Sequence, residues 1–224
     1  MARPSDPSAR TRLITAAREV FLEHGLDRAK VEDITQAAGL SKGAFYLHFK
    51  TKEEAFKEIL GGALAEVGAI MQELEATRDK AAGAGLERMI EGWLVGDMAI
   101  FECLWKHRAI MRLVLDGGGS PDYQHLIEVF AEGAEQLVER LIRFGMDRGY
   151  YRKDIDARHA AAFVAGGYDR LARRMVRERK KPDIERRLIA AQGLCLRALG
   201  TPTIVEVAQN VYARRLSEPR ARAS

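Results

Sequence analysis

Apolar side chains recur at intervals of three and four residues along almost the whole chain, and long alternations of Val, Ile and Thr are absent. Such spacing gathers apolar side chains on one face of an α-helix, whereas a half-buried strand needs strict alternation. The pattern therefore predicts an all-α fold. No uncharged run approaches the roughly 18 residues that a membrane-spanning helix needs, so we expect no membrane partner.

The chain has 224 residues, of which 30% are charged, and its formal net charge is +4. A small positive charge permits nucleic-acid binding without indicating it, so such a prediction depends on where the basic side chains lie. Cys103 and Cys195 lie in apolar helical patterns and are expected as core thiols, which fits the reducing cytoplasm where we place the protein. A redox role for Cys103 or Cys195 is the alternative, and of the two only Cys103 has basic residues close by in the sequence, Lys106 and His107.

Four helices are expected in the first third of the chain, at residues 9–24, 31–38, 41–49 and 52–75. Gly25 favours the end of the first helix, because glycine readily adopts the left-handed conformation that closes many helices. Ser41 is a suitable N-cap residue for the third helix. Thr51 and Glu54 form a capping box for the fourth helix, which is long enough to leave the N-terminal domain.

Longer and more apolar helices are expected after these, at residues 84–105, 107–115, 121–148, 157–180, 183–199 and 202–216. Gly117–Gly119 is interpreted as a linker and not as a phosphate-binding loop, because neither a preceding strand nor a Gly-Lys-Ser/Thr motif accompanies it. The predicted organisation is a disordered arm (1–8), a helix-turn-helix domain (9–55), a larger helical domain (56–216) and a disordered tail (217–224).

The predicted third helix has two different faces. Phe45 and Phe49 lie one turn apart and are expected to anchor this short helix, which alone would be marginal in water. The Gly-containing turn before it is typical of the helix-turn-helix unit, whose second helix enters the major groove of DNA. The opposite face offers small side chains and hydrogen-bond donors, and these are the predicted DNA contacts: Ser41, Lys42, Gly43, Ala44, Tyr46, Leu47 and His48.

Lys52 is added to this predicted surface. A cation in the first turn of a helix opposes the helix dipole, so its position is unusual for a structural residue and reasonable beside a DNA phosphate. Leu47 is suited to contact a thymine methyl group. Each residue also has an ordinary explanation, since Tyr46 and His48 fit a half-exposed helix and the lysines fit a solvated face. Their combination in this order favours DNA binding.

Two segments carry a resemblance to a known family: "LITAAREVFLEHG" and "VEDITQAAGLSKGAFYLHFKTKEEAF". Over about residues 11–60 the chain resembles the DNA-binding domain of the TetR (tetracycline-repressor-like) family of bacterial transcriptional regulators. The resemblance implies that Ser41–Ala44 lead the recognition helix and that Leu47 lies at a base-contacting position. It also implies that three side chains bind backbone phosphate: Tyr46, His48 and Lys52.

One pair of residues departs from the family pattern. The family usually has a Thr/Ser pair at the start of the second helix, where it caps the helix and touches phosphate, and this chain has Ala29 and Lys30 there. The cap is therefore lost. Lys30 is expected to replace the hydroxyl contact with a charge.

The larger domain is expected to dimerise, so that two heads bind a palindromic operator in double-stranded DNA. The resemblance implies that the predicted helices 157–180 and 183–199 pair with their mates as a four-helix bundle. The apolar residues proposed for this interface are Leu171, Met175, Leu188, Ala191, Cys195 and Leu199. The alternative is that these stripes form intramolecular core.

The resemblance also implies an inducer pocket in this domain. The large adaptable side chains considered for it are Met89, Trp93, Phe101, Trp105, Met111, Tyr123, Phe130, Phe163 and Tyr168. Aromatic and Met side chains at helical spacing also form ordinary core, which is the alternative for each residue. A pocket of this composition favours a hydrophobic or aromatic small molecule.

Other classes of function find little support. His107, His125 and His159 lack metal-ligand spacing, and no catalytic motif was found, so no metal, cofactor or enzymatic activity is expected. The basic segment 170–187 is interpreted as a solvated helix end and not as a second nucleic-acid surface. The predicted function is a DNA-binding repressor that a ligand releases from its operator. The alternative is a dimeric DNA-binding regulator whose helical body only dimerises or docks a partner.

Overall fold

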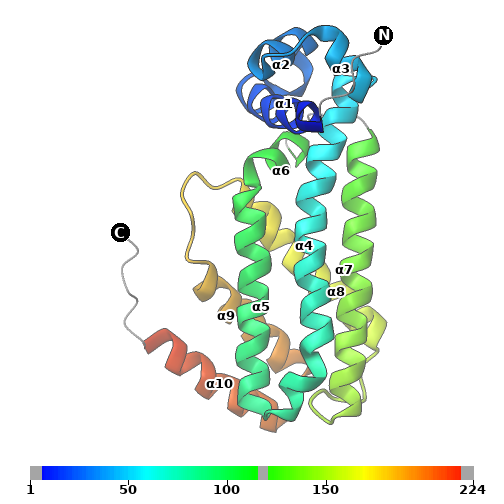
Figure 1. Ribbon diagram of the computed structural model, residues 1–224. Coiled ribbons are helices and arrows are strands. Elements are labelled where there is room, and N and C mark those ends of the chain that lie inside the picture. Colours follow the sequence, from blue (N-terminus) through cyan, green and yellow to red (C-terminus); the bar gives the residue numbers. More distant parts are fainter. Residues whose placement is uncertain (1–6, 116–120, 218–224) are drawn as a thin grey trace. The chain divides into compact units, whose positions relative to one another are not determined.

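The computed structural model describes residues 7–115 and 121–217, and this part of the chain contains ten helices and no strand. All the expected helices are present, so the predicted all-α fold is confirmed (Figure 1). Their bounds are α1 (Pro7–Arg28), α2 (Val31–Ala38), α3 (Lys42–His48), α4 (Lys52–Gly83), α5 (Leu86–Lys106), α6 (Arg108–Leu115), α7 (Pro121–Asp147), α8 (Ala157–Val176), α9 (Ile184–Leu199) and α10 (Pro202–Ser217).

The main differences from the expected helices are at their ends. α4 continues to Gly83 and not only to about residue 75, whereas α8 ends at Val176 and not at residue 180. Gly25 has φ 77° and ψ 168°, so the predicted stop is present as a break within α1, after which a short turn reaches Arg28. Parts of the predicted arm, linker and tail lie outside the described residues: 1–6, Gly117–Gly119 and 218–224.

The chain forms two compact units, called here the first unit and the second unit. Within the described residues the first unit comprises 7–66, 106–115 and 121–129, and the second comprises 67–105 and 130–217. The first unit therefore contains α6 and the start of α7 in addition to α1, α2, α3 and the start of α4. None of the described helices combines the length and the apolar character that a bilayer-spanning helix requires.

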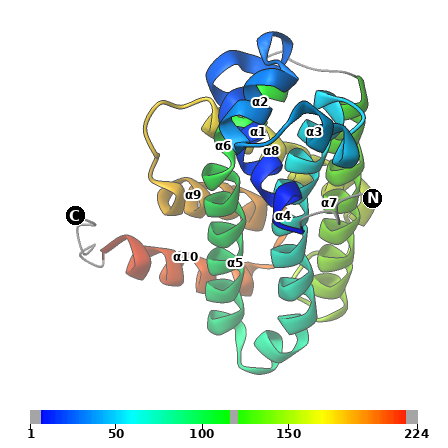
Figure 2. The same cartoon turned by 45° about the horizontal axis from the view of Figure 1, so that its top comes forward.

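The core of the first unit is aromatic. Figures 1 and 2 show α1, α2 and α3 gathered together, and Phe21, Phe45, Phe49 and Phe56 are almost completely buried among them and the start of α4. The rings of Phe21 and Phe56 meet edge to face, with centroids 5.3 Å apart, and those of Phe45 and Phe49 lie 5.5 Å apart. The anchoring role predicted for Phe45 and Phe49 is therefore confirmed.

The turn between α2 and α3 depends on Gly39, whose φ is 62°. Its N–H donates to the Gln36 carbonyl at 3.1 Å, and the Leu40 N–H donates to the Thr35 carbonyl at 2.9 Å. These bonds close the C-terminus of α2, and a side chain at residue 39 would strain this left-handed backbone. Arg12 of α1 adds a bond from its guanidinium to the Ala38 carbonyl at 2.6 Å.

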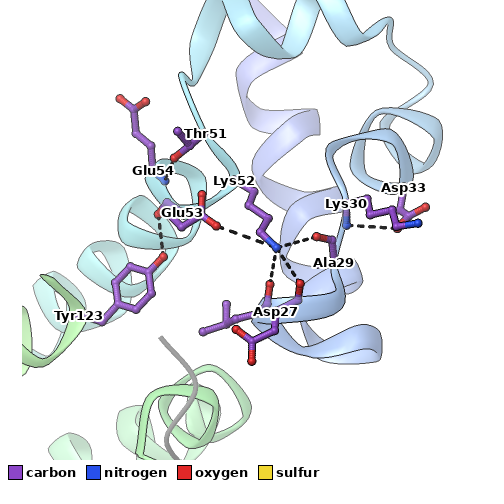
Figure 3. A network of polar contacts seen from close by, with 10 residues as sticks. Asp27, Ala29, Lys30, Asp33, Thr51, Lys52, Glu53, Glu54 and Tyr123 are labelled. Atoms are coloured by element: carbon purple, nitrogen blue, oxygen red, sulfur yellow. Dashed lines mark hydrogen bonds and ion pairs between the residues drawn. The ribbon is translucent and has the colours of Figure 1, made fainter. Parts of the chain in front are cut away.

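The start of α4 is capped as the sequence predicts. The Glu54 N–H donates to the Thr51 hydroxyl at 3.2 Å. The Glu54 carboxylate reaches one residue further back than in the usual box and accepts the Lys50 N–H at 2.6 Å (Figure 3 shows Thr51 and Glu54). Residues 50–54 therefore form a tightly bonded entry to α4.

In the second unit, the C-terminal part of α4 runs beside α5 (Figures 1 and 2). Gly96 of α5 permits this approach, since a Cβ at residue 96 would lie 2.5 Å from Cδ2 of Leu74. Ile142 of α7 packs against Ala157 and Ala161 of α8, and small side chains allow these helices to approach closely as well. The second unit is therefore a packed assembly of helices.

Candidate functional site

The exposed face of α3 carries most of the predicted DNA contacts. Ser41 caps the helix, because its hydroxyl accepts the Ala44 N–H at 3.1 Å. While Phe45 is fully buried, Tyr46 is 52% exposed and Leu47 is 77% exposed. The remaining predicted contacts are also accessible: Ser41, Lys42 and Gly43 are exposed, and Ala44 and His48 are half-buried. The first unit therefore presents one continuous polar and apolar face around the N-terminus of α3.

Lys42 has a partner within this face. Its ammonium donates to the Glu32 carboxylate of α2, and this hydrogen bond holds the pKa of Glu32 below its usual range. Both side chains are more than half exposed, at 53% and 59%. Exposed ion pairs of this kind contribute little to stability, so a phosphate can replace Glu32 as the partner of Lys42 at small cost.

Lys52 does not have the geometry of a phosphate ligand. Its ammonium donates to the carbonyls of Leu26, Asp27 and Ala29 at 2.8, 3.0 and 2.9 Å (Figure 3). An ammonium has three N–H donors, and these carbonyls use all of them. The side chain is only 22% exposed. The phosphate contact predicted for Lys52 is therefore corrected to a structural role: the ammonium joins the start of α4 to carbonyls of the short turn after Gly25 and of Ala29, in the segment before α2.

Lys30 occupies the N-cap position of α2, and its exposed side chain makes no capping hydrogen bond with the helix. The Asp33 carboxylate accepts the Lys30 N–H at 3.2 Å and so supplies half of a capping box. Ala29, the other departure from the family pattern, is buried and gives its carbonyl to Lys52. The expected loss of a hydroxyl cap is therefore partly offset by Asp33, and Lys30 stays accessible for a phosphate.

Two residues of the predicted dimer stripe are buried within their own chain. Met175 and Leu188 are 1% and 0% exposed within one chain, so they are core residues, which corrects their assignment. The other members of the stripe are half-buried: Leu171, Ala191, Cys195 and Leu199. The exposed apolar side chains lie elsewhere on the same helices, at Phe163 of α8 (83% exposed) and Leu194 of α9 (65% exposed). Phe163 is thus also excluded from an interior pocket.

The remaining predicted pocket residues divide between the two units. Met111 and Tyr123 are buried in the first unit, where the Tyr123 hydroxyl donates to the Glu53 carbonyl at 3.2 Å (Figure 3). Tyr123 also packs edge to face on Phe56. These two residues therefore pack in the core of the first unit, and their role in a ligand pocket stays a prediction. The others belong to the second unit, where Met89, Phe101 and Trp105 are buried and Trp93, Phe130 and Tyr168 are half-buried.

The second unit contains a polar cluster that the sequence pattern did not predict. Gln192 of α9 donates to the Asp97 carboxylate of α5 at 2.7 Å and accepts the Tyr212 hydroxyl of α10 at 2.8 Å. The Tyr168 hydroxyl of α8 also bonds to Asp97. Burial raises the pKa of Asp97 to about 6, and it outweighs these bonds, which act in the opposite direction. One feature of the sequence could have indicated this cluster: Asp97 is an acidic residue four positions from both Trp93 and Phe101 in an apolar helix.

The comparisons with known proteins agree with this architecture. Residues 13–59 match the family model described as "Bacterial regulatory proteins, tetR family". The chain is 30% identical over 156 residues to the HTH-type transcriptional repressor KstR2 of Rhodococcus jostii, covering 69% of this chain and 74% of the relative.

Solved structures extend the similarity over most of the chain. SmeT, the repressor of the Stenotrophomonas maltophilia multidrug efflux pump SmeDEF, is 26% identical with a TM-score of 0.63, and the match covers 87% of this chain and 92% of SmeT. A complex of SmeT with triclosan gives a TM-score of 0.67 at 24% identity, over 88% and 94% of the two chains.

Proposed function

The chain belongs to the tetR family of bacterial regulatory proteins, and we propose that it is a homodimeric repressor that a small, mostly apolar molecule releases from a palindromic operator. The observation that carries the DNA-binding part is the division of α3: Phe45 and Phe49 are buried on one side, and Tyr46 and Leu47 are exposed on the other. A short helix so anchored can enter a major groove without losing its position.

The proposed contacts follow from the accessible groups on this face. Ser41, Lys42, Gly43 and Ala44 bring the positive N-terminal end of α3 and an ammonium to the phosphates, and the small side chains let the backbone approach. Tyr46 and His48 donate to phosphate oxygens, and Leu47 touches a thymine methyl group. Lys30 adds a charge from the start of α2. Lys52 is left out, because its donors are used within the first unit.

Replacing Tyr46 with Phe is expected to lower operator affinity about tenfold, because a hydrogen bond to a charged phosphate is lost. The ring keeps its edge-to-face contact with Phe45, whose centroid lies 5.6 Å away, so the melting temperature should not change. Fluorescence anisotropy measures the affinity, with an operator recovered by selection from genomic fragments. Leu22→Ala, which removes another exposed apolar group of the first unit, is the matched control and should bind normally. Equal affinity of Tyr46→Phe and the wild type would reject this contact.

The proposed dimer face is the exposed side of α8 and α9. Phe163 and Leu194 are large and exposed there, and small exposed residues surround them: Ala162, Gly166, Gly167, Ala190 and Ala198. Large side chains among small ones allow two helix pairs to interlock closely. A second copy of the chain is the proposed occupant, because two heads are needed to bind both halves of a palindrome.

Leu194→Glu is expected to convert the dimer to a monomer, because the interface would then bury an unpaired carboxylate. Sedimentation at micromolar concentration should give the monomer mass, and operator affinity should fall at least tenfold. Val95→Glu on α5, where Val95 is 56% exposed, adds the same charge outside the proposed interface and should stay dimeric. A dimeric Leu194→Glu variant would show that another face pairs.

Ligand release is proposed from the composition of the second unit. Aromatic rings line its interior, as in the stacking of Trp93 on Tyr151 and the edge contact of Phe101 with Tyr168. The complex of SmeT with triclosan supports the view that a protein of this fold can hold an aromatic molecule. A ligand that prefers a conformation of lower operator affinity shifts the population towards it and releases DNA.

A further inference from the structure

We infer that Asp97 anchors an organic cation, so that the ligand of the second unit is an amine with an apolar body. The inference rests on the proposed function in that it names the chemistry of the ligand-binding interior. It is based on the surroundings of the Asp97 carboxylate, where several helices contribute neutral polar side chains.

The polar groups around Asp97 come from separate parts of the second unit. Asp97 lies on α5, Tyr168 on α8, Gln192 on α9 and Tyr212 on α10, while Tyr151 lies between α7 and α8. The Tyr151 ring stacks on Trp93 with centroids 6.2 Å apart. Polar side chains that converge from so many elements on one point are typical of a binding site within an apolar interior.

The cluster has a negative charge without a positive one. Only burial and the hydrogen bonds of Gln192 and Tyr168 act on the pKa of Asp97, and within the described residues no Lys, Arg or His contributes. Burial together with the Asp97 charge raises the pKa values of the phenols Tyr151 and Tyr212, which therefore stay neutral. A half-buried carboxylate without a counter-ion is partly desolvated at a cost in free energy, and a ligand cation offsets that cost directly.

Aromatic rings in the same part of the second unit favour the same ligand. Tyr168 meets Phe101 edge to face at 6.0 Å, and Tyr151 and Trp93 form a stacked pair. Rings of this kind attract ammonium groups through their electron-rich faces and accommodate the hydrocarbon part of an amine. An alcohol would gain only a hydrogen bond, and a carboxylic acid would be repelled by Asp97.

The cluster also keeps accessible surface. Asp97, Tyr151 and Tyr168 are half-buried and not fully buried. These residues therefore retain some accessible surface. The proposed site requires the cationic group of a ligand to reach Asp97 through this remaining surface.

The test compares three probes that share a phenyl ring and a butyl chain: phenylbutylamine, phenylbutanol and phenylbutyrate. Binding to the full-length protein is measured by titration of tryptophan fluorescence, because Trp93 and Trp105 are both in the second unit. The amine is expected to bind about tenfold more tightly than the alcohol, and the carboxylate not to bind, since charge-assisted hydrogen bonds are about twice as strong as neutral ones. Asp97→Asn, which keeps the shape of the side chain, should abolish the preference for the amine.

Glu102→Gln is the matched control, because Glu102 lies on the same helix and pairs with Lys181 at the surface. It should keep the preference for the amine. The cation site is overturned by any of four results: equal binding of amine and alcohol, binding of the carboxylate, an unchanged preference in Asp97→Asn, or no binding of any probe.

Anisotropy with operator DNA separates the proposed cation site from the proposed ligand release. If the amine binds through Asp97 but leaves operator affinity unchanged, the cation site is supported and ligand release is contradicted. If only the alcohol releases the operator, ligand release is supported and the cation site is contradicted.

Discussion

Replacing Lys52 with Met is expected to lower the free energy of unfolding of the first unit by about 2–3 kcal/mol, because the three carbonyls of Leu26, Asp27 and Ala29 lose a charged donor. Met keeps most of the apolar stem, so the change isolates the ammonium. Both tryptophans lie in the second unit, so their fluorescence reports on the first unit only indirectly. Denaturation followed by circular dichroism, together with amide exchange in α1 and α4, is the suitable measurement.

Lys50→Met is the control for this prediction. Lys50 is exposed two residues away and engages Glu54 through its backbone N–H and not through its ammonium. Its stability should change by less than about 0.5 kcal/mol, as is usual for surface substitutions. If Lys52→Met is as stable as Lys50→Met but binds DNA weakly, the structural role is refuted and the phosphate contact is restored.

Replacing Asp97 with Asn is expected to make the second unit more stable at neutral pH. The pKa of Asp97 is raised from 3.8 to about 6 in the folded protein, so folding favours the protonated acid. The stabilisation from this group is complete below about pH 4 and is lost as the pH rises through about 6. The advantage of Asp97→Asn over the wild type should therefore grow by about 2–3 kcal/mol between pH 4 and pH 7.5.

Denaturation followed by tryptophan fluorescence at several pH values tests this slope. Comparing the variant with the wild type at each pH removes the contribution of every other titrating group. Glu102→Gln, which removes a surface carboxylate from the same helix, is the matched control. A flat difference for Asp97→Asn would mean that Asp97 titrates as an exposed acid does, and the argument for an uncompensated buried charge would then fail.

Local patterns were enough to predict the helices and the two faces of α3. The spacing of apolar residues, Ser41 as N-cap, Gly25 and Gly39 as breaks, and the pair Phe45 and Phe49 all act within a few residues, and the structure confirms them. Such signals are readable because helix periodicity and capping depend on neighbours in the sequence. The sequence alone therefore determined the fold class and the surface proposed to bind DNA.

Lys52, Asp97 and the exposed side of α8 and α9 were decided only by the tertiary structure. The partners of Lys52 lie 23 to 26 residues away, and one partner of Asp97, Gln192 in α9, lies 95 residues away. For α8 and α9, two sides of each helix carry apolar residues, and only packing within the chain reveals that Met175 and Leu188 are covered while Phe163 and Leu194 are not. Sequence spacing shows which residues share a helix face, but which neighbour fills that face depends on contacts between distant parts of the chain.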